Sequence, residues 1–294
     1  MPIVNRQKPV AAPGQVRKPV PQADGVLARI KPVILSMSGI KLSLYGRGKT
    51  GKTRLACTFP GPVLVIGTED GTKSVAGTKD LDFVRLNQSD EIQDLVNMLR
   101  DDSPQNDRRY RSIVLDTAGG MQDLITKEVL GLSDVPTQRS WGMATQQVWG
   151  AIAVQTKDRL SSLLRLADTH NLNVVIIAHE RNFNDDVASE VMVPTVGSAL
   201  TPSASGWLAT AVDYIGQCYI REQTVLRVSE SGDKERHLTG KKEYCLRVGP
   251  HPVYQSGFRL PPGFYLPDNI VNPSYAKVAQ IIRGEYKDPA KKEV

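Results

Sequence analysis

Cysteine, histidine and long apolar runs are all scarce in this chain of 294 residues. Its three cysteines, Cys57, Cys218 and Cys245, lie far apart and form no CxxC pair, and its four histidines form no ligand cluster. Neither a disulfide framework nor a structural zinc site is therefore predicted. No apolar run approaches the roughly 18 residues of a membrane span, and the N-terminus lacks the apolar segment of a secretory signal. We expect a cytoplasmic protein with no membrane partner.

Acidic residues are nearly absent from the first 35 residues, which carry most of the net positive charge. The formal net charge of the chain is +6, and residues 1–35 hold six basic side chains against Asp24 alone. This segment also repeats Lys-Pro-Val and shows neither helical nor strand periodicity. We predict a flexible, disordered, basic and proline-rich tail. It serves either as a linker or as an arm that gathers nucleic acid through its phosphates.

From residue 39 onward, short apolar runs alternate with helical stretches. The runs are rich in Val, Ile and Leu, which is typical of strands covered on both faces. Strands are predicted at 39–46, 62–67, 112–116 and 173–179. Helices are predicted at 52–58, 89–100 and about 144–171. Alternating strands and helices predict an α/β fold with a mostly parallel central sheet.

Beyond residue 180 the alternation of apolar runs and helical stretches ends. A long loop is predicted at 181–205, overlapping a short helix near 204–212, and antiparallel strands are predicted at 213–221, 223–229 and 242–248. The whole pattern predicts one α/β domain over 36–285 with a β-rich C-terminal extension, followed by a short tail at 286–294.

The stretch GRGKTGKT, residues 46–53, matches every fixed position of the phosphate-binding pattern G-x-x-x-x-G-K-[ST]. It follows a predicted strand and opens a helix, so backbone N–H groups converge on the β-phosphate of a nucleotide. Lys52 is expected to reach the β- and γ-phosphates, and the Thr53 hydroxyl to coordinate Mg²⁺. The predicted nucleotide-binding set is Gly46, Arg47, Gly48, Lys49, Thr50, Gly51, Lys52 and Thr53.

Two carboxylates are predicted to complete this site. Asp116 ends the strand SIVLD and is expected to hold Mg²⁺ directly or through water. Thr117 follows it, where many nucleotide motors place a catalytic glutamate. Glu69 lies at the end of the second predicted strand, and the helix that follows the phosphate loop joins this strand to the first, so both strand ends are expected near the same phosphates. We predict that Glu69 orients the attacking water, with capping of a following turn as the alternative.

These motifs together resemble the RecA-type ATPases. In detail, TFPGPVLVIGTEDG, LDTAGG and VVIIAHE resemble the small phage-encoded RecA-like ATPases, including the Sak-type single-strand annealing proteins, over about residues 38–260. The resemblance implies a RecA-like P-loop NTPase fold, with ATP and Mg²⁺ as cofactors. It further implies action on single-stranded DNA in recombination, annealing or replication, self-association into a ring or filament, and a single-strand-binding protein as a partner in a bacterial host.

The resemblance also implies roles for residues outside the phosphate loop. His179, or Glu180 beside it, closes the fourth strand where RecA-type proteins sense the γ-phosphate, although the recombinases carry an amide there. Two loops would contact DNA, one through Arg139 and Trp141 and the other beginning at Arg181; alternatively, Trp141 packs under the following helix. A basic residue from a neighbouring subunit would complete the site, and the candidates are Lys241, Lys242, Arg247 and Arg259.

The sequence leaves three other functions open. An assembly or switch protein would use ATP to stabilise an oligomer with little hydrolysis. A hexameric helicase-like motor would share the same core. A small-molecule kinase would need a basic lid over ATP, and the charged segment 230–242 is the one candidate for such a lid.

Overall fold

The computed structural model describes residues 39–69, 71–101, 110–132, 145–183, 195–228 and 234–287. The chain divides into two units, Met1–Ser36 and Met37–Val294, and all the described residues belong to the second unit. The predicted tail at 1–35 and most of that at 286–294 lie outside the described residues, as do Arg139 and Trp141.

The described strands form one mixed sheet. Its order is β10-β8-β7-β1-β5-β4-β2-β3, with β6 beside β5 and β9 beside β7. The bounds are β1 (Lys41–Gly46), β2 (Val63–Gly67), β3 (Leu81–Arg85), β4 (Ser112–Asp116), β5 (Asn173–Phe183), β6 (Thr195–Ser198), β7 (Tyr214–Val228), β8 (Lys234–Arg247), β9 (Gly257–Phe258) and β10 (Asn269–Val271). Strands β7, β1, β5, β4, β2 and β3 pair in parallel, and the remaining pairs are antiparallel. The prediction of a mostly parallel α/β sheet with an antiparallel C-terminal end is confirmed.

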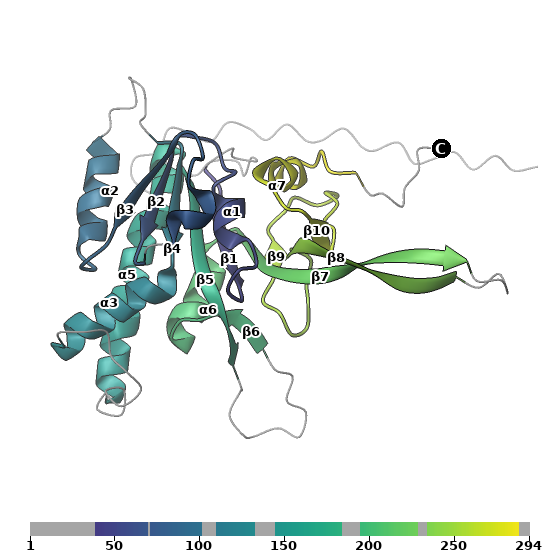
Figure 1. Ribbon diagram of the computed structural model, residues 1–294. Helices are drawn as coiled ribbons and strands as arrows, with labels where there is room; N and C mark the ends of the chain where they lie inside the picture. The colour runs from purple at the N-terminus through teal and green to yellow at the C-terminus, as the bar shows by residue number, and fades with distance from the viewer. Residues whose placement is uncertain are drawn as a thin grey trace, which may run out of the picture. The chain divides into compact units, whose positions relative to one another are not determined.

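Helices cover both faces of the parallel part of the sheet (Figure 1). They are α1 (Lys52–Ala56), the 3-10 helix η2 (Thr72–Val75), α2 (Glu91–Asp101), α3 (Ala118–Leu130), α5 (Gln146–His170), α6 (Pro202–Ala211) and α7 (Tyr275–Ile282). Among the described residues, no helix is both long enough and apolar enough to cross a membrane.

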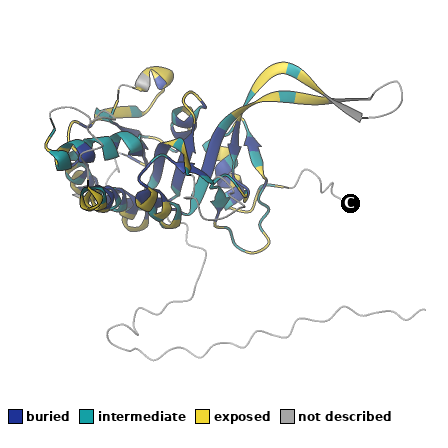
Figure 2. Ribbon diagram, turned by 90° about the horizontal axis from the view of Figure 1, so that it is seen from below, coloured by how far each residue is buried: buried dark blue, intermediate teal, exposed yellow. Residues whose placement is uncertain are grey.

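The alternation of side chains along the strands divides the core into two layers. On β2, Leu64 and Ile66 pack into a cluster with α2, α3, α5 and α6, whereas Val63 and Val65 pack on the other face with α1 and α7. Successive strand residues point to opposite faces, so a strand buried on both faces needs a continuous apolar run. Figure 2 shows these strands as the most deeply buried part of the described chain.

Beyond the parallel strands, β7 and β8 continue as a two-stranded ribbon (Figures 1 and 2). The pairing runs from Gln217↔Arg247 to Val228↔Lys234, with a register shift between Glu222 and Thr224. We expected two strands, 213–221 and 223–229, but β7 is continuous through this point because the irregularity is a bulge rather than a turn. On the ribbon, Leu238 is 67% exposed and Val225 is 36% exposed, so these apolar side chains lie outside the core.

The sheet order corrects one expectation. Strands β1 and β2 are consecutive in the chain, and we expected their ends to meet at the same phosphates. Instead, β5 and β4 lie between them. The crossover through α1 skips these two positions because β5, a strand distant in sequence, pairs directly with β1. The end of β2 therefore lies beside the end of β4.

Candidate nucleotide site

The phosphate loop joins β1 to α1 in a conformation that its glycines make possible. A Cβ atom on Gly46 would lie 2.1 Å from the backbone oxygen of Cys218 on β7, so a larger residue does not fit. Gly51 caps the start of α1 with φ 86, a left-handed conformation that glycine adopts without strain. The Thr50 hydroxyl donates to the backbone oxygen of Arg47 over 2.8 Å and closes the loop on itself. The loop is thus held in shape by its own chain.

Lys52 lies buried inside the curve of this loop. Its Nζ donates to the backbone oxygens of Gly46 and Arg47 at 2.8 and 2.7 Å. Burial lowers the pKa of its ammonium group, and nearby Asp116 opposes that shift. The lysine is therefore held at the loop, where a phosphate group would replace the backbone oxygens as its partner.

Thr53 and Asp116 meet at the carboxyl edge of the sheet. The Thr53 hydroxyl donates to Asp116 Oδ2 over 2.6 Å, which joins the first turn of α1 to the end of β4. Hydroxyl and carboxylate oxygens are ligands that Mg²⁺ accepts, and this ion commonly takes one or two protein oxygens and completes its shell with phosphates and water. The two side chains fit a magnesium ion, and when bound that ion would neutralise charge on the transferring phosphate.

Glu69 lies exposed two residues beyond β2. The register pairs Gly67 with Asp116, and the Thr68 N–H donates to the backbone oxygen of Asp116 over 3.2 Å. Glu69 therefore follows β2, which is hydrogen-bonded to β4, the strand that carries Asp116. Asp123 on α3 lies close enough to interact with it: burial, and next the charge of Glu69, raise the pKa of the Asp123 carboxyl.

We expected His179 and Glu180 to close a strand at residue 179, but β5 continues to Phe183 and both residues lie inside it. His179 pairs in register with Gly46 and is exposed. Glu180 instead accepts a hydrogen bond at 2.8 Å from Nε of Arg47 in the phosphate loop. Glu180 also accepts one at 3.4 Å from Gln217 on β7. We predicted His179 as the phosphate sensor, and the structure joins Glu180, its alternative, to the loop.

The hydrogen bonds from Arg47 to Glu180 and from Gln217 to Glu180 continue across the sheet to Arg247. Gln217 accepts a hydrogen bond from Nε of Arg247 over 3.0 Å. The Arg247 guanidinium lies over the ring of Tyr219 and over that of Tyr254, 5.2 and 4.7 Å from their centroids. The negative face of an aromatic ring attracts a cation. Arg247 is therefore engaged by its own chain.

The other basic candidates for a trans contact differ in their surroundings. Arg259 pairs with Asp213 at 3.3 Å and donates to the backbone oxygen of Thr210 at 2.7 Å. Lys241 and Lys242 are exposed on β8 near the base of the ribbon. Arg259 is exposed as well, but unlike Arg247 and Arg259 the two lysines make no salt bridge or cation–π contact within the described part of the chain.

A cavity of about 410 Å³ opens beside the phosphate loop. Its lining consists of Lys49, Thr50, Gly51, Lys52, Thr53, Arg54, Ser74 and Tyr244. The last three lie outside the predicted set. Arg54 adjoins the motif and was within reach of sequence reasoning, but Ser74 on η2 and Tyr244 on β8 belong to no pattern that we recognised.

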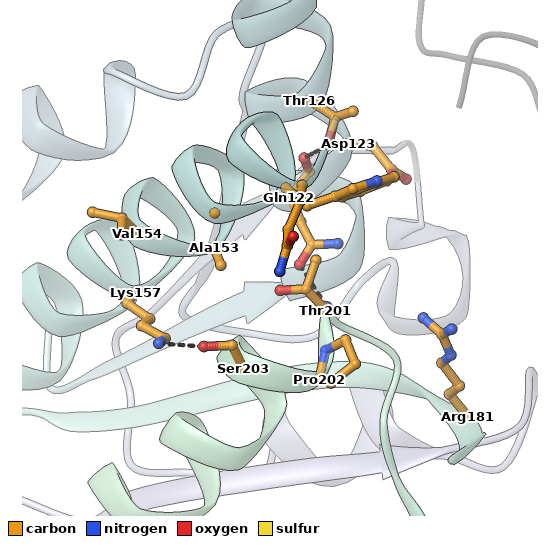
Figure 3. A pocket seen from close by; sticks show the side chains of 13 residues that line it. Gln122, Asp123, Thr126, Ala153, Val154, Lys157, Arg181, Thr201, Pro202 and Ser203 are labelled. Carbon is orange, nitrogen blue, oxygen red and sulfur yellow. Dashed lines mark hydrogen bonds between the residues drawn. The ribbon is translucent and has the colours of Figure 1, made fainter. Parts of the chain in front are cut away.

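A second cavity, of about 600 Å³, lies between α3, α5 and the start of α6 (Figure 3). Gln122 and Asp123 line it from α3, and Val154 and Lys157 line it from α5. Figure 3 shows Arg181 on the far side of the cavity from Val154. Asp123, which lines this cavity, is also the residue whose carboxyl pKa is raised by burial and by the charge of Glu69.

Comparison with protein families adds a decisive observation. A family model described as AAA domain matches residues 38–260, well over half of the chain. The chain belongs to the AAA domain family. As a member it is an AAA-type P-loop ATPase, a class that binds ATP with Mg²⁺, and its mostly parallel sheet fits this class. Comparison with curated proteins finds no match.

Proposed function

We propose that this AAA domain is a RecA-type ATPase of the Sak-type phage group, which assembles into a ring or filament and acts on single-stranded DNA in recombination, annealing or replication. The observation that supports the ATPase part is the 2.6 Å hydrogen bond between Thr53 and Asp116, because it joins the helix that follows the phosphate loop to the end of β4. The exposure of Lys241 and Lys242 supports a role for one of them in the site of a neighbouring subunit.

Hydrolysis requires a group that orients water opposite the leaving phosphate. Thr117 stands in the position after Asp116, and β2, which pairs with the strand of Asp116, is followed by the exposed carboxylate Glu69. Lys52 holds the β- and γ-phosphates, Thr53 and Asp116 hold the metal, and Glu69 holds the water. Glu180 or His179 reports the state of the loop to the segment that follows β5.

Glu69→Gln tests the hydrolytic assignment. The amide keeps the size of the side chain but accepts a proton poorly, so ATP turnover is expected to fall about 100-fold while ATP binding persists. Glu285→Gln, an exposed carboxylate beyond α7, is the matched control and should turn over ATP at the wild-type rate. Equal and negligible rates in wild type and Glu69→Gln would instead favour a switch protein that uses ATP only to assemble.

The second cavity supports the DNA part of the proposal. Arg181 and Lys157 supply positive charge, and Trp149 and Pro202 supply flat apolar surface. A cation beside an aromatic ring suits phosphate contact combined with base stacking. Lys157 Nζ donates to the Ser203 hydroxyl over 2.6 Å, which fixes that cation at the rim of the cavity.

ATP turnover measured with and without single-stranded DNA across a salt series tests this role. We expect stimulation at low salt that disappears as salt rises, because phosphate contacts release counterions. Arg181→Ala should reduce the stimulation, whereas Arg283→Ala, an exposed control at the end of α7, should not. Absence of stimulation at the lowest salt would remove the DNA role, and duplex unwinding by the isolated chain would favour a helicase-like motor.

A further inference from the structure

The cavity beside the phosphate loop is larger than a triphosphate requires. Residues 49–54 supply the loop and the first turn of α1, which together account for phosphate contacts. The base and ribose of a nucleotide need further surface, and aromatic side chains commonly provide it in small-molecule sites. Tyr244 is the aromatic residue in the lining of this cavity.

The backbone of Tyr244 is held firmly although it lies at the base of the ribbon. Tyr244 pairs with Ile220 on β7, and its carbonyl accepts a hydrogen bond from the Asn272 N–H over 2.7 Å. The next residue, Cys245, pairs with Val271 on β10. Tyr244 thus belongs to the three-stranded part of the sheet, and its ring is presented from a rigid element.

The ring lies directly against the phosphate loop. A Cβ atom built on Gly51 would lie 3.2 Å from Cδ1 of Tyr244 and 3.7 Å from Cε1, so the ring is in van der Waals reach of the loop backbone. The side chain is nevertheless 40% exposed, and the exposed part borders the cavity. A large aromatic ring left open beside a nucleotide loop has surface available for stacking.

We propose that Tyr244 is the platform on which the purine base of bound ATP stacks, and that it gives the site its preference for a nucleotide over a bare polyphosphate. The inference rests on the proposed ATP binding, and it adds a residue from the C-terminal extension to that site. The stacking face of the ring supplies the contact, and the phenolic hydroxyl is not required. Because every base has a π-face, stacking on Tyr244 does not select adenine alone, and the ligand class is a nucleoside triphosphate.

The test compares two ligands on the full-length chain by titration calorimetry: Mg-ATP, and magnesium tripolyphosphate, which lacks base and ribose. In the wild type, Mg-ATP is expected to bind more tightly than tripolyphosphate. Tyr244→Ala should weaken Mg-ATP binding by about 5-fold or more and leave tripolyphosphate binding unchanged, whereas Tyr244→Phe should resemble the wild type for both ligands. Leu238→Ala, an exposed apolar truncation further out on the same strand, is the matched control and should change neither.

Several outcomes would overturn the proposal that Tyr244 stacks on the base. Equal weakening of both ligands in Tyr244→Ala would assign the ring to the shape of the phosphate loop, and weakening of tripolyphosphate in Tyr244→Phe would assign the hydroxyl to a phosphate contact. Equal affinity of the wild type for both ligands would also overturn it while leaving phosphate binding intact. A wild type that binds neither ligand would remove the proposed ATP binding itself. Thermal melting of each variant separates these results from loss of fold.

Discussion

The parallel body of the sheet and the β7–β8 ribbon are made of the same kind of element and are stabilised differently. On β5, Ile177 is fully buried between the sheet and its helices, whereas Leu238 on β8 is 67% exposed. A two-stranded ribbon has no second layer to bury its apolar residues against, so its stability depends on the strands to which it is joined. The parallel body of the sheet can therefore hold functional side chains at fixed distances from one another, whereas packing constrains the outer ribbon less.

The nucleotide site is divided along the same line. The groups expected to hold phosphate and metal lie on β1, α1 and β4, all within the body. Tyr244 lies where the ribbon joins the body, at the last position that a third strand still supports. If the proposals hold, the residues that act on the phosphates lie on the rigid part of the sheet, and the residue that selects the ligand lies at its margin.

The largest effect should come from the centre of the body. Lys52→Ala removes the buried cation that the loop holds for the phosphates, and ATP turnover is expected to fall by about 1,000-fold. Steady-state hydrolysis measured beside far-ultraviolet circular dichroism checks it. Retention of more than a tenth of the wild-type rate with an intact fold would show that the loop does not act through this lysine.

A matched pair of truncations tests the comparison directly. Ile177→Ala should reduce the free energy of unfolding by about 3 kcal/mol, because it leaves a cavity between α1 and the sheet. Leu238→Ala should change it by less than about 0.5 kcal/mol, because the residue it truncates is exposed. Urea denaturation of both variants gives the two values. Similar losses would mean that the ribbon is packed in solution, as a contact between subunits would require.

A smaller effect is expected where the body borders the second cavity. Burial, and next Glu69, raise the pKa of Asp123 in the folded protein, so the folded state favours the protonated acid. Stability is then lost as the pH rises from the ordinary pKa of an aspartate through the raised value, and Asp123→Asn avoids that loss. Because Asp123 is partly exposed to water, we expect the variant to melt only about 1–2 °C higher at neutral pH.

The pH dependence supplies the check on this assignment. The difference in melting temperature between wild type and Asp123→Asn should disappear at acidic pH, below the ordinary aspartate range, where the carboxyl is protonated in both states. A difference that persists unchanged at acidic pH would assign it to the amide itself rather than to the charge.

Local patterns were sufficient for the phosphate loop and for the four most apolar strands. Residues 46–53 form a contiguous motif, and the continuous run of β4 can be buried only between two layers. The pattern failed at β3, whose sequence LDFVR is largely exposed on an edge strand. It also failed at α3, where two glycines follow Ala118 and weaken the helical signal, although Thr117 caps the helix by accepting from the Gly120 N–H.

Contacts between distant segments could not be predicted. The pairing of Tyr45 with Gln217 brings β7 beside the phosphate loop, and no local feature of either segment indicates it. That pairing carries β8 to the loop, so the position of Tyr244 depends on it as well. The sequence also could not decide between His179 and Glu180 as the phosphate sensor. Which of the two side chains faces the phosphate loop depends on how β5 pairs with its neighbours.

The hydrogen bond from Thr53 to Asp116 also bears on the order in which ligands arrive. A magnesium ion can take both oxygens only after the hydroxyl proton has turned away from the carboxylate. Opening this contact would bring Thr53 and Asp116 little in return if the ion came alone with its water shell, whereas Lys52 would gain its phosphate partners at the same moment if ion and triphosphate came together. We expect metal and nucleotide to enter as one complex, so that the dependence of activity on added magnesium follows the formation of Mg-ATP in solution.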